Sequence, residues 1–287
     1  MAITSFLPES KFLHKIRLWK VKRQDRKLYE GLKELHIDYN GKDQVSFSFL
    51  GERFTIKLNP NRKHKQYLSF LFYFVNEEFS NYFKYYIPKR GDVVVDLGGF
   101  LGAVSFYMAH LVKDSGHVYV FEPNTANNEF IRDLIELNNL KNITLIKKGV
   151  YNENSTLTFY GTGSSGSFNN IYGKDVKFEF DVVEFDSFVE ERKLKKIDFI
   201  KSDIESAEIE FLLGAEKTIK DGVIRNMAIA TYHRIGEGER AYTECEKILA
   251  QHNCKYITHM TNGSTPFTTY VKNKNDNKKS ADVRKDL

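Results

Sequence analysis

The chain has 287 residues, of which 41% are hydrophobic and 28% charged, and its formal net charge is +5. This composition is typical of a soluble globular protein, and the length suits one large domain with an appendage. The two cysteines, Cys245 and Cys254, are too few for a disulfide framework or a cysteine-based zinc site, which fits a reducing compartment. Because no apolar run approaches the ~18 residues of a membrane span and the first residues lack the pattern of a signal peptide, we expect a cytoplasmic location.

The positive charge lies at the two ends of the chain. Residues 1–36 carry nine Lys or Arg against four Asp or Glu, and residues 272–287 carry six against three. The part between them is therefore slightly negative. A basic core that follows a nucleic-acid backbone is not indicated by this distribution.

Residues 1–90 predict an appendage that packs on the following domain. Helical spacing of apolar residues within 10–35 predicts a basic helix, and alternation over 44–58 predicts a β-hairpin. The segment 65–86 is rich in Phe and Tyr and predicts helix that ends before Pro88. For the basic helix we keep several roles open: a lid on the core, a peripheral contact with an anionic membrane surface, nucleic-acid binding, or dimerisation.

From residue 91 onward, apolar strands alternate with helices. The expected strands are 92–97, 117–122, 143–149, 197–203 and 225–232, and the expected helices are 102–113, 125–139, 186–194, 206–220 and 239–253. An antiparallel pair that turns at Asn262-Gly263 follows. This pattern predicts an α/β Rossmann-like fold over 91–272, with a mostly parallel seven-stranded sheet, helices on both faces and an antiparallel final strand pair. We expect a β insert at 151–185 and a disordered polar tail at 273–287.

The first strand of this series ends in a glycine-rich turn, within GDVVVDLGGFLG at 91–102. Glycine lets the backbone turn tightly and approach a ligand closely. The spacing does not match the dinucleotide pattern G-x-G-x-x-G, and Asp96, just before the turn, would repel a pyrophosphate. S-adenosylmethionine (SAM) carries an ammonium and a sulfonium and no phosphate. We therefore hypothesise that Asp96 faces a cationic ligand of this kind.

The second strand also ends in an acid, Glu122, within VFEPN. A carboxylate at this place can accept both hydroxyls of a ribose, as it does in nicotinamide enzymes. Glu122 therefore fits SAM and NAD about equally, and Asp96 is the residue that disfavours a nicotinamide oxidoreductase.

Residues 91–271 resemble the FkbM family of class I SAM-dependent methyltransferases. The resemblance rests on VVVDLGGFLGAVS, on VYVFEPNTANNEFIRDLIELNNLKNITLI, on the Asp-Ser-Phe of VEFDSFVEE and on KKIDFIKSDIESAEIEFLLGAEKTI, in that order. The sequence departs from the family at Ser206, where Gly is usual, and at Gly99, where Ala is common. The resemblance implies SAM as the methyl donor, O-methylation of a hydroxyl on a sugar, glycan or small metabolite, and no required metal. It carries over Asp96, Gly98, Gly102, Glu122, Asp203, Glu205 and Glu208.

The expected site lies at the carboxyl ends of the parallel strands. The cofactor-binding set that we expect comprises Asp96, Gly98, Gly99, Phe100, Gly102, Glu122, Pro123, Asn124, Gly149, Val150 and Asp203. A poorly acidic hydroxyl needs a proton acceptor, and Asp203 or His233 is the expected base, since a histidine has a reference pKa of about 6.5. We expect Glu205 to bind substrate hydroxyls or to orient a neighbour, and the loop 162–167 to act as a lid.

Each assignment has an alternative. Asp203 could cap the following helix, Glu208 could pair with a lysine or solvent, and His233 could be a structural residue. These carboxylates and His233 could also hold a divalent ion, but without a His pair at i, i+4 we predict no metal site. The alternative functions are an RNA methyltransferase and a catalytically silent scaffold. Neither an N-P-P-Y motif nor a cysteine at a strand end supports base methylation, so we expect a small-molecule or glycan partner and no nucleic acid.

Overall fold

We describe the protein from a computed structural model. The structure describes residues 38–39, 43–49, 52–59, 61, 64–74, 77–162, 165–167, 176–236, 239–261 and 265–272. The predictions for the basic helix at 10–35 and for the tail at 273–287 lie outside these residues. No helix among the described residues has the length and apolar character needed to cross a membrane.

The centre of the fold is a seven-stranded sheet with the order β13-β14-β12-β11-β4-β5-β6. Its strands are β4 (Val93–Leu97), β5 (His117–Phe121), β6 (Ile143–Ile146), β11 (Phe199–Ser202), β12 (Asn226–Ala230), β13 (Lys255–Thr261) and β14 (Thr265–Lys272). Neighbours from β6 to β12 pair in parallel, whereas β14 runs antiparallel to β12 and β13 antiparallel to β14. The predicted α/β Rossmann-like fold, with a mostly parallel seven-stranded sheet and an antiparallel final strand pair, is confirmed.

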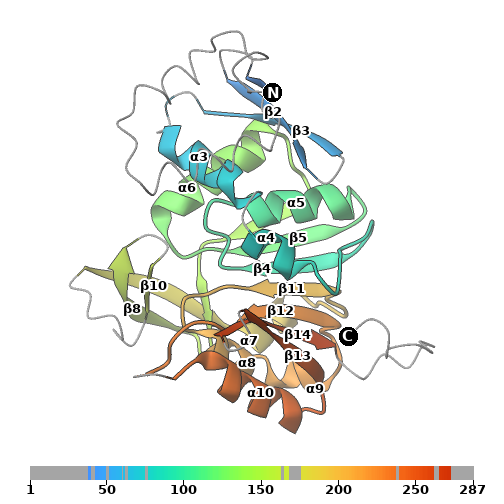
Figure 1. Cartoon of the computed structure of the whole chain (residues 1–287), viewed down its shortest axis with the longest axis vertical. Coiled ribbons are helices and arrows are strands. Elements are labelled where there is room, and N and C mark those ends of the chain that lie inside the picture. Colours follow the sequence, from blue (N-terminus) through green and yellow to red (C-terminus); the bar gives the residue numbers. More distant parts are fainter. Residues whose placement is uncertain are drawn as a thin grey trace.

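Helices cover both faces of this sheet (Figure 1). One face packs against α5 (Ala103–Val112) and α6 (Thr125–Leu137). The other face packs against α7 (Phe185–Glu191), α8 (Glu208–Leu213), α9 (Glu216–Lys220) and α10 (Ala241–Gln251). Two separate apolar cores therefore hold the sheet between them, which is why Val94 and Val95 of β4 are fully buried.

The described N-terminal elements extend the first of these cores. A small sheet with the order β1-β2-β3 consists of β1 (Asp38–Tyr39), β2 (Gln44–Phe49) and β3 (Glu52–Lys57), and it is followed by α3 (His64–Tyr73) and α4 (Glu77–Tyr82). The ring of Phe49 lies 5.4 Å from that of Tyr107 in α5, and the ring of Tyr67 lies 5.1 Å from that of Phe130 in α6. Phe47, Phe54, Phe70 and Phe74 belong to the same buried cluster. This aromatic packing fixes the N-terminal elements on α5 and α6.

The insert expected between the third and fourth parallel strands forms a second sheet, with the order β7-β10-β8-β9. Its strands are β7 (Gly149–Tyr151), β8 (Ser155–Thr162), β9 (Ser165–Ser167) and β10 (Lys177–Glu184). Most of the residues that we expected to form a lid loop, 162–167, instead end β8 and form β9, with Gly161 opposite Gly166. The prediction of a loop there is wrong because the small polar residues continue a hairpin ladder.

Two helices expected from periodicity are interrupted. The segment 65–86 divides into α3 and α4, and the segment 206–220 divides into α8 and α9, which are separated by Gly214 and Ala215. A Cβ at Gly214 would lie 2.3 Å from the carbonyl oxygen of Tyr151, so the chain passes against the insert sheet here. The break between α8 and α9 thus has a packing cause that apolar spacing alone does not reveal.

Candidate functional site

The glycine turn after β4 lies between the ends of two neighbouring strands. The amides of Gly98 and Gly99 both donate to the carbonyl of Phe121 in β5, at 3.0 and 2.9 Å. On the side of β11, a Cβ at Gly98 would lie 1.9 Å from the carbonyl oxygen of Asp203, and Gly98 has a φ of +80°. Both the close approach and the left-handed backbone require glycine at this position.

Beside this turn lies a cavity at the carboxyl ends of the parallel strands, where open α/β sheets bind their ligands. Its lining combines the sheet ends with the insert and with one N-terminal side chain: Tyr73, Gly98, Phe100, Phe121, Glu122, Pro123, Asn124, Asn127, Gly149, Val150, Phe159, Phe178, Phe180, Asp203, Ile204, Glu205 and Ala207. The lining is largely apolar, and its acidic side chains are the carboxyls of Glu122, Asp203 and Glu205.

Glu122 anchors the β5 side of the cavity. Its Oε2 accepts from the amide of Phe100 at 2.7 Å, and its Oε1 accepts from the amide of Asn124 at 2.9 Å. Burial raises the pKa of Glu122 to about 7, although these amides, Asn127 and the Lys201 ammonium act in the opposite direction. The carboxyl therefore titrates near neutral pH and keeps lone pairs available for ligand hydroxyls.

Asp203 follows β11 directly and lies in the wall of the cavity, where its side chain is 12% exposed. Its Oδ2 accepts from the hydroxyl of Tyr82 at 2.8 Å. Tyr82 comes from the N-terminal helix α4 and is 1% exposed. A residue 121 positions earlier in the sequence thus orients the carboxylate.

His233 follows β12 and is surrounded by three carboxylates. Its Nδ1 lies 2.7 Å from Oε1 of Glu208, and its Nε2 lies 3.5 Å from Oδ1 of Asp203 and 3.9 Å from Oε2 of Glu205. Burial alone would lower its pKa, but the charges of Glu208, Asp203 and Glu205 and the hydrogen bond with Glu208 outweigh it and raise the pKa to about 10. These charges favour the imidazolium form of His233 at neutral pH, which favours Asp203 over His233 as the general base.

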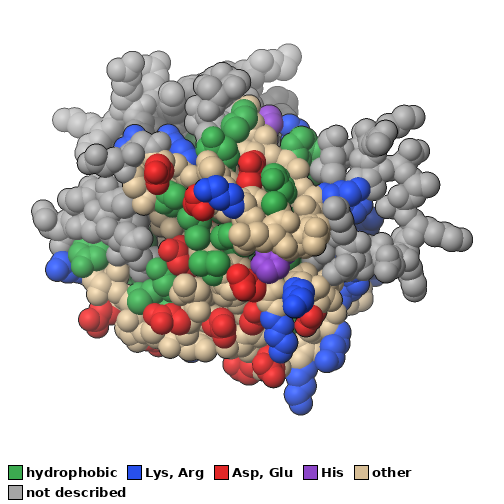
Figure 2. Space-filling model, turned by 90° about the horizontal axis from the view of Figure 1, so that it is seen from below, with side chains coloured by type: hydrophobic (Ala, Val, Ile, Leu, Met, Phe, Trp, Pro, Cys, Tyr) green, Lys and Arg blue, Asp and Glu red, His purple; other side chains and the backbone are tan. Residues whose placement is uncertain are grey.

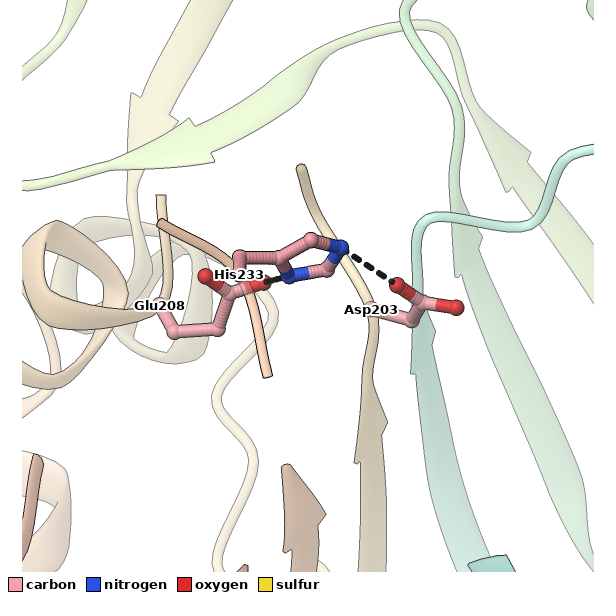
Figure 3. Close-up of side chains that lie close together, drawn as sticks. All are labelled: Asp203, Glu208 and His233. Carbon is pink, nitrogen blue, oxygen red and sulfur yellow. Dashed lines mark hydrogen bonds and ion pairs between the residues drawn. The ribbon is translucent and has the colours of Figure 1, made fainter. Parts of the chain in front are cut away.

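Figure 3 shows the imidazole ring lying between the carboxylates of Glu208 and Asp203. Asp203, Glu208 and His233 each offer a possible metal-ligand atom, all within 4.8 Å of one another. The two carboxylates, however, interact with different ring nitrogens on opposite sides. A metal ion needs ligand atoms that converge on one point, whereas these three side chains contact one another in a row, with the imidazole in the middle.

Asp96 does not reach the cavity, contrary to our hypothesis. Its side chain is fully buried, its Oδ1 lies 3.0 Å from Nζ of Lys201, and its Oδ2 accepts from the hydroxyl of Ser105. Asp96 and Lys201 are register partners on the paired strands β4 and β11. The cation that Asp96 faces is thus a lysine of the chain itself.

Most other members of the expected cofactor set line the cavity: Gly98, Phe100, Glu122, Pro123, Asn124, Gly149, Val150 and Asp203. Glu205 lines it as well, whereas Gly99 and Gly102 do not. A Cβ at Gly99 would meet Cγ2 of Val120 at 2.3 Å, so this residue lies against β5, and Gly102 is the N-cap of α5. Both glycines shape the turn from behind rather than from the cavity side.

The backbone on both sides of the cavity is strained. Phe100, Glu205 and Ser206 have φ values of 48°, 54° and 76°, in the left-handed region that non-glycine residues rarely adopt. Ser206 stands where glycine is usual in the resembling family, and its buried hydroxyl has no hydrogen-bond partner among the described residues. Strained positions of this kind concentrate at ligand sites.

Sequence reasoning missed the aromatic part of the site. Tyr73 and Tyr82 come from the segment 65–86, where only helix was predicted, and Phe159, Phe178 and Phe180 come from the insert. The alternation in VKFEF at 176–180 places Phe178 and Phe180 on one face of β10, which was the available signal. Lys201, a charged residue inside the apolar stretch IDFIKSD, was another.

The strand order, the glycine turn and the acid at the end of the second parallel strand together define a class I SAM-dependent methyltransferase fold. The sequence model for the methyltransferase FkbM domain matches residues 93–258, which is more than half of the chain. The chain therefore belongs to the FkbM methyltransferase family, and its cofactor is SAM.

Solved structures with a similar arrangement are distant. A methyltransferase FkbM from Methylobacillus flagellatus is 17% identical, with a TM-score of 0.47, and the match covers 73% of this chain and 54% of that one. Fibrillarin from Aeropyrum pernix, solved with natively bound SAM, is 13% identical, with a TM-score of 0.44 and coverage of 82% and 97%. A SAM-dependent methyltransferase from Aquifex aeolicus is 16% identical, with a TM-score of 0.37 and coverage of 64% and 84%.

The match thus spans only about half the length of the Methylobacillus protein. No curated protein matches this chain. The family assignment therefore rests on the sequence match over 93–258.

Proposed function

We propose that this protein transfers a methyl group from SAM to a hydroxyl oxygen of an uncharged sugar, glycan or small metabolite, with Asp203 as the proton acceptor. The observation that carries the proposal is the position of Asp203, whose carboxylate lies in the cavity wall and is oriented by Tyr82. Glu205 lines the same part of the cavity.

The residues around the cavity fit SAM. Glu122 has both oxygens directed by backbone amides and offers its remaining lone pairs to the ribose hydroxyls. The glycine turn has no side chain in the way, and the carboxylates of Asp203 and Glu205 suit an ammonium group. When bound, SAM supplies a methyl group activated by attachment to a positively charged sulfur.

The side chains then have two tasks, to place the acceptor hydroxyl and to take its proton. Positioning of this kind provides much of the rate enhancement in a displacement reaction. Asp203 accepts the hydroxyl proton as the oxygen gains the methyl group, and the proton leaves with solvent after product release. His233 is already protonated and does not take this proton; its charge holds Asp203 and Glu205 in place.

The charges around the cavity favour an uncharged acceptor over RNA. Glu122, Asp203 and Glu205 line it, and no Lys or Arg among the described residues does. A phosphate backbone would be repelled by these carboxylates. Over the described surface seen in Figure 2, acidic side chains spread across the middle and basic ones gather mainly toward the margins, so the described side chains on this face form no continuous basic track.

The test is transfer of labelled methyl from SAM to a panel of uncharged hydroxylated acceptors, with total RNA as the competing class. We expect label in a hydroxylated acceptor, lost in Asp203→Asn and kept in Asp221→Asn, which changes an exposed acid at the end of α9. Label in RNA would support the nucleic-acid alternative. Binding of S-adenosylhomocysteine (SAH) without transfer to any acceptor would support the silent-scaffold alternative.

A further inference from the structure

A charged lysine lies inside the most buried part of the sheet. Lys201 belongs to β11, in which every residue is buried, and it is 3% exposed. Removing an ammonium from water costs several kcal/mol unless other groups compensate for it. Its surroundings therefore need to supply that compensation.

The ammonium of Lys201 contacts one carboxylate and two backbone carbonyls. Nζ forms an ion pair with Oδ1 of Asp96 at 3.0 Å, and it donates hydrogen bonds to the carbonyls of Gly98 at 2.7 Å and Leu97 at 3.2 Å. Nζ also lies 5.5 Å from the ring centre of Tyr82, within the range of a cation–π contact. These contacts compensate for the burial of the ammonium.

These contacts give the glycine turn a charge on each side. The carbonyls of Leu97 and Gly98 point to the Lys201 cation, while the amide of Phe100 donates to the Glu122 carboxylate. The turn has no side chains of its own at Gly98 and Gly99 with which to hold its shape. Its peptide groups are instead held between a buried cation and a carboxylate that faces the cavity.

We propose that Lys201 is a positioning residue for the cofactor site, which fixes the glycine turn through its carbonyls and supplies a positive charge near Glu122. Asp96 pairs with Lys201 from the neighbouring strand. The inference concerns SAM binding only and does not depend on the nature of the acceptor. The field of Lys201 at Glu122 acts in the required direction, since it lowers the pKa of that carboxyl.

The experiment measures SAH affinity by calorimetry between pH 5.5 and 8.5. The main variant combines Lys201→Met with Asp96→Asn, so that neither charge is left buried without its partner. We expect SAH binding at pH 7 to weaken by roughly tenfold. We expect the midpoint of its pH dependence to move up, because Glu122 loses the positive charge of Lys201, which lowers the pKa of that carboxyl.

Two further variants separate this electrostatic effect from damage to the fold. Asp96→Asn alone keeps the cation, so its midpoint should not rise even if its thermal stability falls. Lys196→Met removes a lysine that is half exposed and pairs with Asp198, and it should leave both affinity and midpoint unchanged.

An unchanged midpoint in the double variant, or a rise of equal size in Asp96→Asn, would overturn the proposal. If the double variant does not fold, a rise in Asp96→Asn alone still decides against it, and the absence of that rise supports it. Wild-type protein that binds no SAH would overturn the cofactor site itself, an outcome separate from failure to find an acceptor.

Discussion

Oε1 of Glu208 lies 2.7 Å from Nδ1 of His233, and neither side chain is more than 5% exposed. Glu208 also accepts from the amide of Ile204 at 3.2 Å, which fixes its position beside the end of β11. Because the pair is buried, each charge depends on the other, and removing one partner leaves an uncompensated ion. His233 thereby becomes a fixed positive charge behind the carboxylates of the cavity.

This pair predicts a loss of stability at high pH. The folded pKa of His233 is about 10, above its reference value of 6.5, so its contribution is complete below pH 6.5 and is lost as pH rises through 10. This loss is measured as the free energy of unfolding in urea, for the wild type and His233→Gln at pH 7, 9 and 10.5. We expect the wild type to lose more free energy of unfolding than the variant, and parallel pH profiles would contradict the assignment.

The carboxyl of Glu122 predicts that cofactor binding becomes stronger as pH rises. Its pKa of about 7 is above the reference value, so the free site is partly protonated at neutral pH. Ribose hydroxyls bind the carboxylate more strongly than the neutral acid, so SAH affinity should rise by about tenfold between pH 5.5 and 8. Glu122→Gln should bind weakly at every pH, whereas Glu129→Gln, an exposed change on α6, should behave as wild type.

Tyr82→Phe tests the orientation of Asp203 and has a matched control. The Tyr82 hydroxyl donates to Asp203 at 2.8 Å, and the Tyr86 hydroxyl donates to Asp92 at 2.7 Å, away from the cavity. Tyr82→Phe should lower kcat roughly tenfold, as expected for loss of one hydrogen bond to a charged group. Tyr86→Phe should reduce stability by about 1 kcal/mol and leave kcat unchanged. Equal effects of the two changes on kcat would show that Tyr82 acts only through the fold.

Ser206→Gly should stabilise the protein. Ser206 has a φ of 76° and a buried hydroxyl with no hydrogen-bond partner among the described residues, so glycine relieves two unfavourable features. We expect a gain of about 1 kcal/mol in the free energy of unfolding, despite the larger backbone entropy of glycine in the unfolded chain. Ser115→Gly, at an exposed turn without a positive φ, should give no gain. A loss in both variants would contradict the strain at Ser206.

The alternation of strands and helices was predictable because each element has its own hydrophobic period. The glycine turn and Glu122 were predictable because each directly follows a predicted strand. A single segment does not show which other segment it will contact in the fold. Asp96 and Lys201 become neighbours only when β4 pairs with β11. Because the sequence does not show this pairing, the Asp96 carboxylate was assigned to a ligand.

The charge state of His233 was not predictable from the sequence for a related reason. Its reference pKa suits a base, but its actual surroundings include Glu208 from α8 and Asp203 and Glu205 from the segment after β11. Those charges converge only in the folded chain, and their sum reverses the effect of burial. The aromatic wall of the insert and the two tyrosines of the N-terminal elements likewise depend on how separate sheets and helices come together.

The N-terminal aromatic packing has a consequence for where the folding unit begins. The family match begins at residue 93, but the core shared with α5 and α6 begins with Val45 and Phe47. From this earlier region Tyr73 lines the cavity and Tyr82 donates to Asp203. A fragment cut at residue 90 would expose a large aromatic surface and would lack both tyrosines. The folding unit therefore extends upstream of the match, and we expect changes there to alter the cavity while leaving the glycine turn and Glu122 intact.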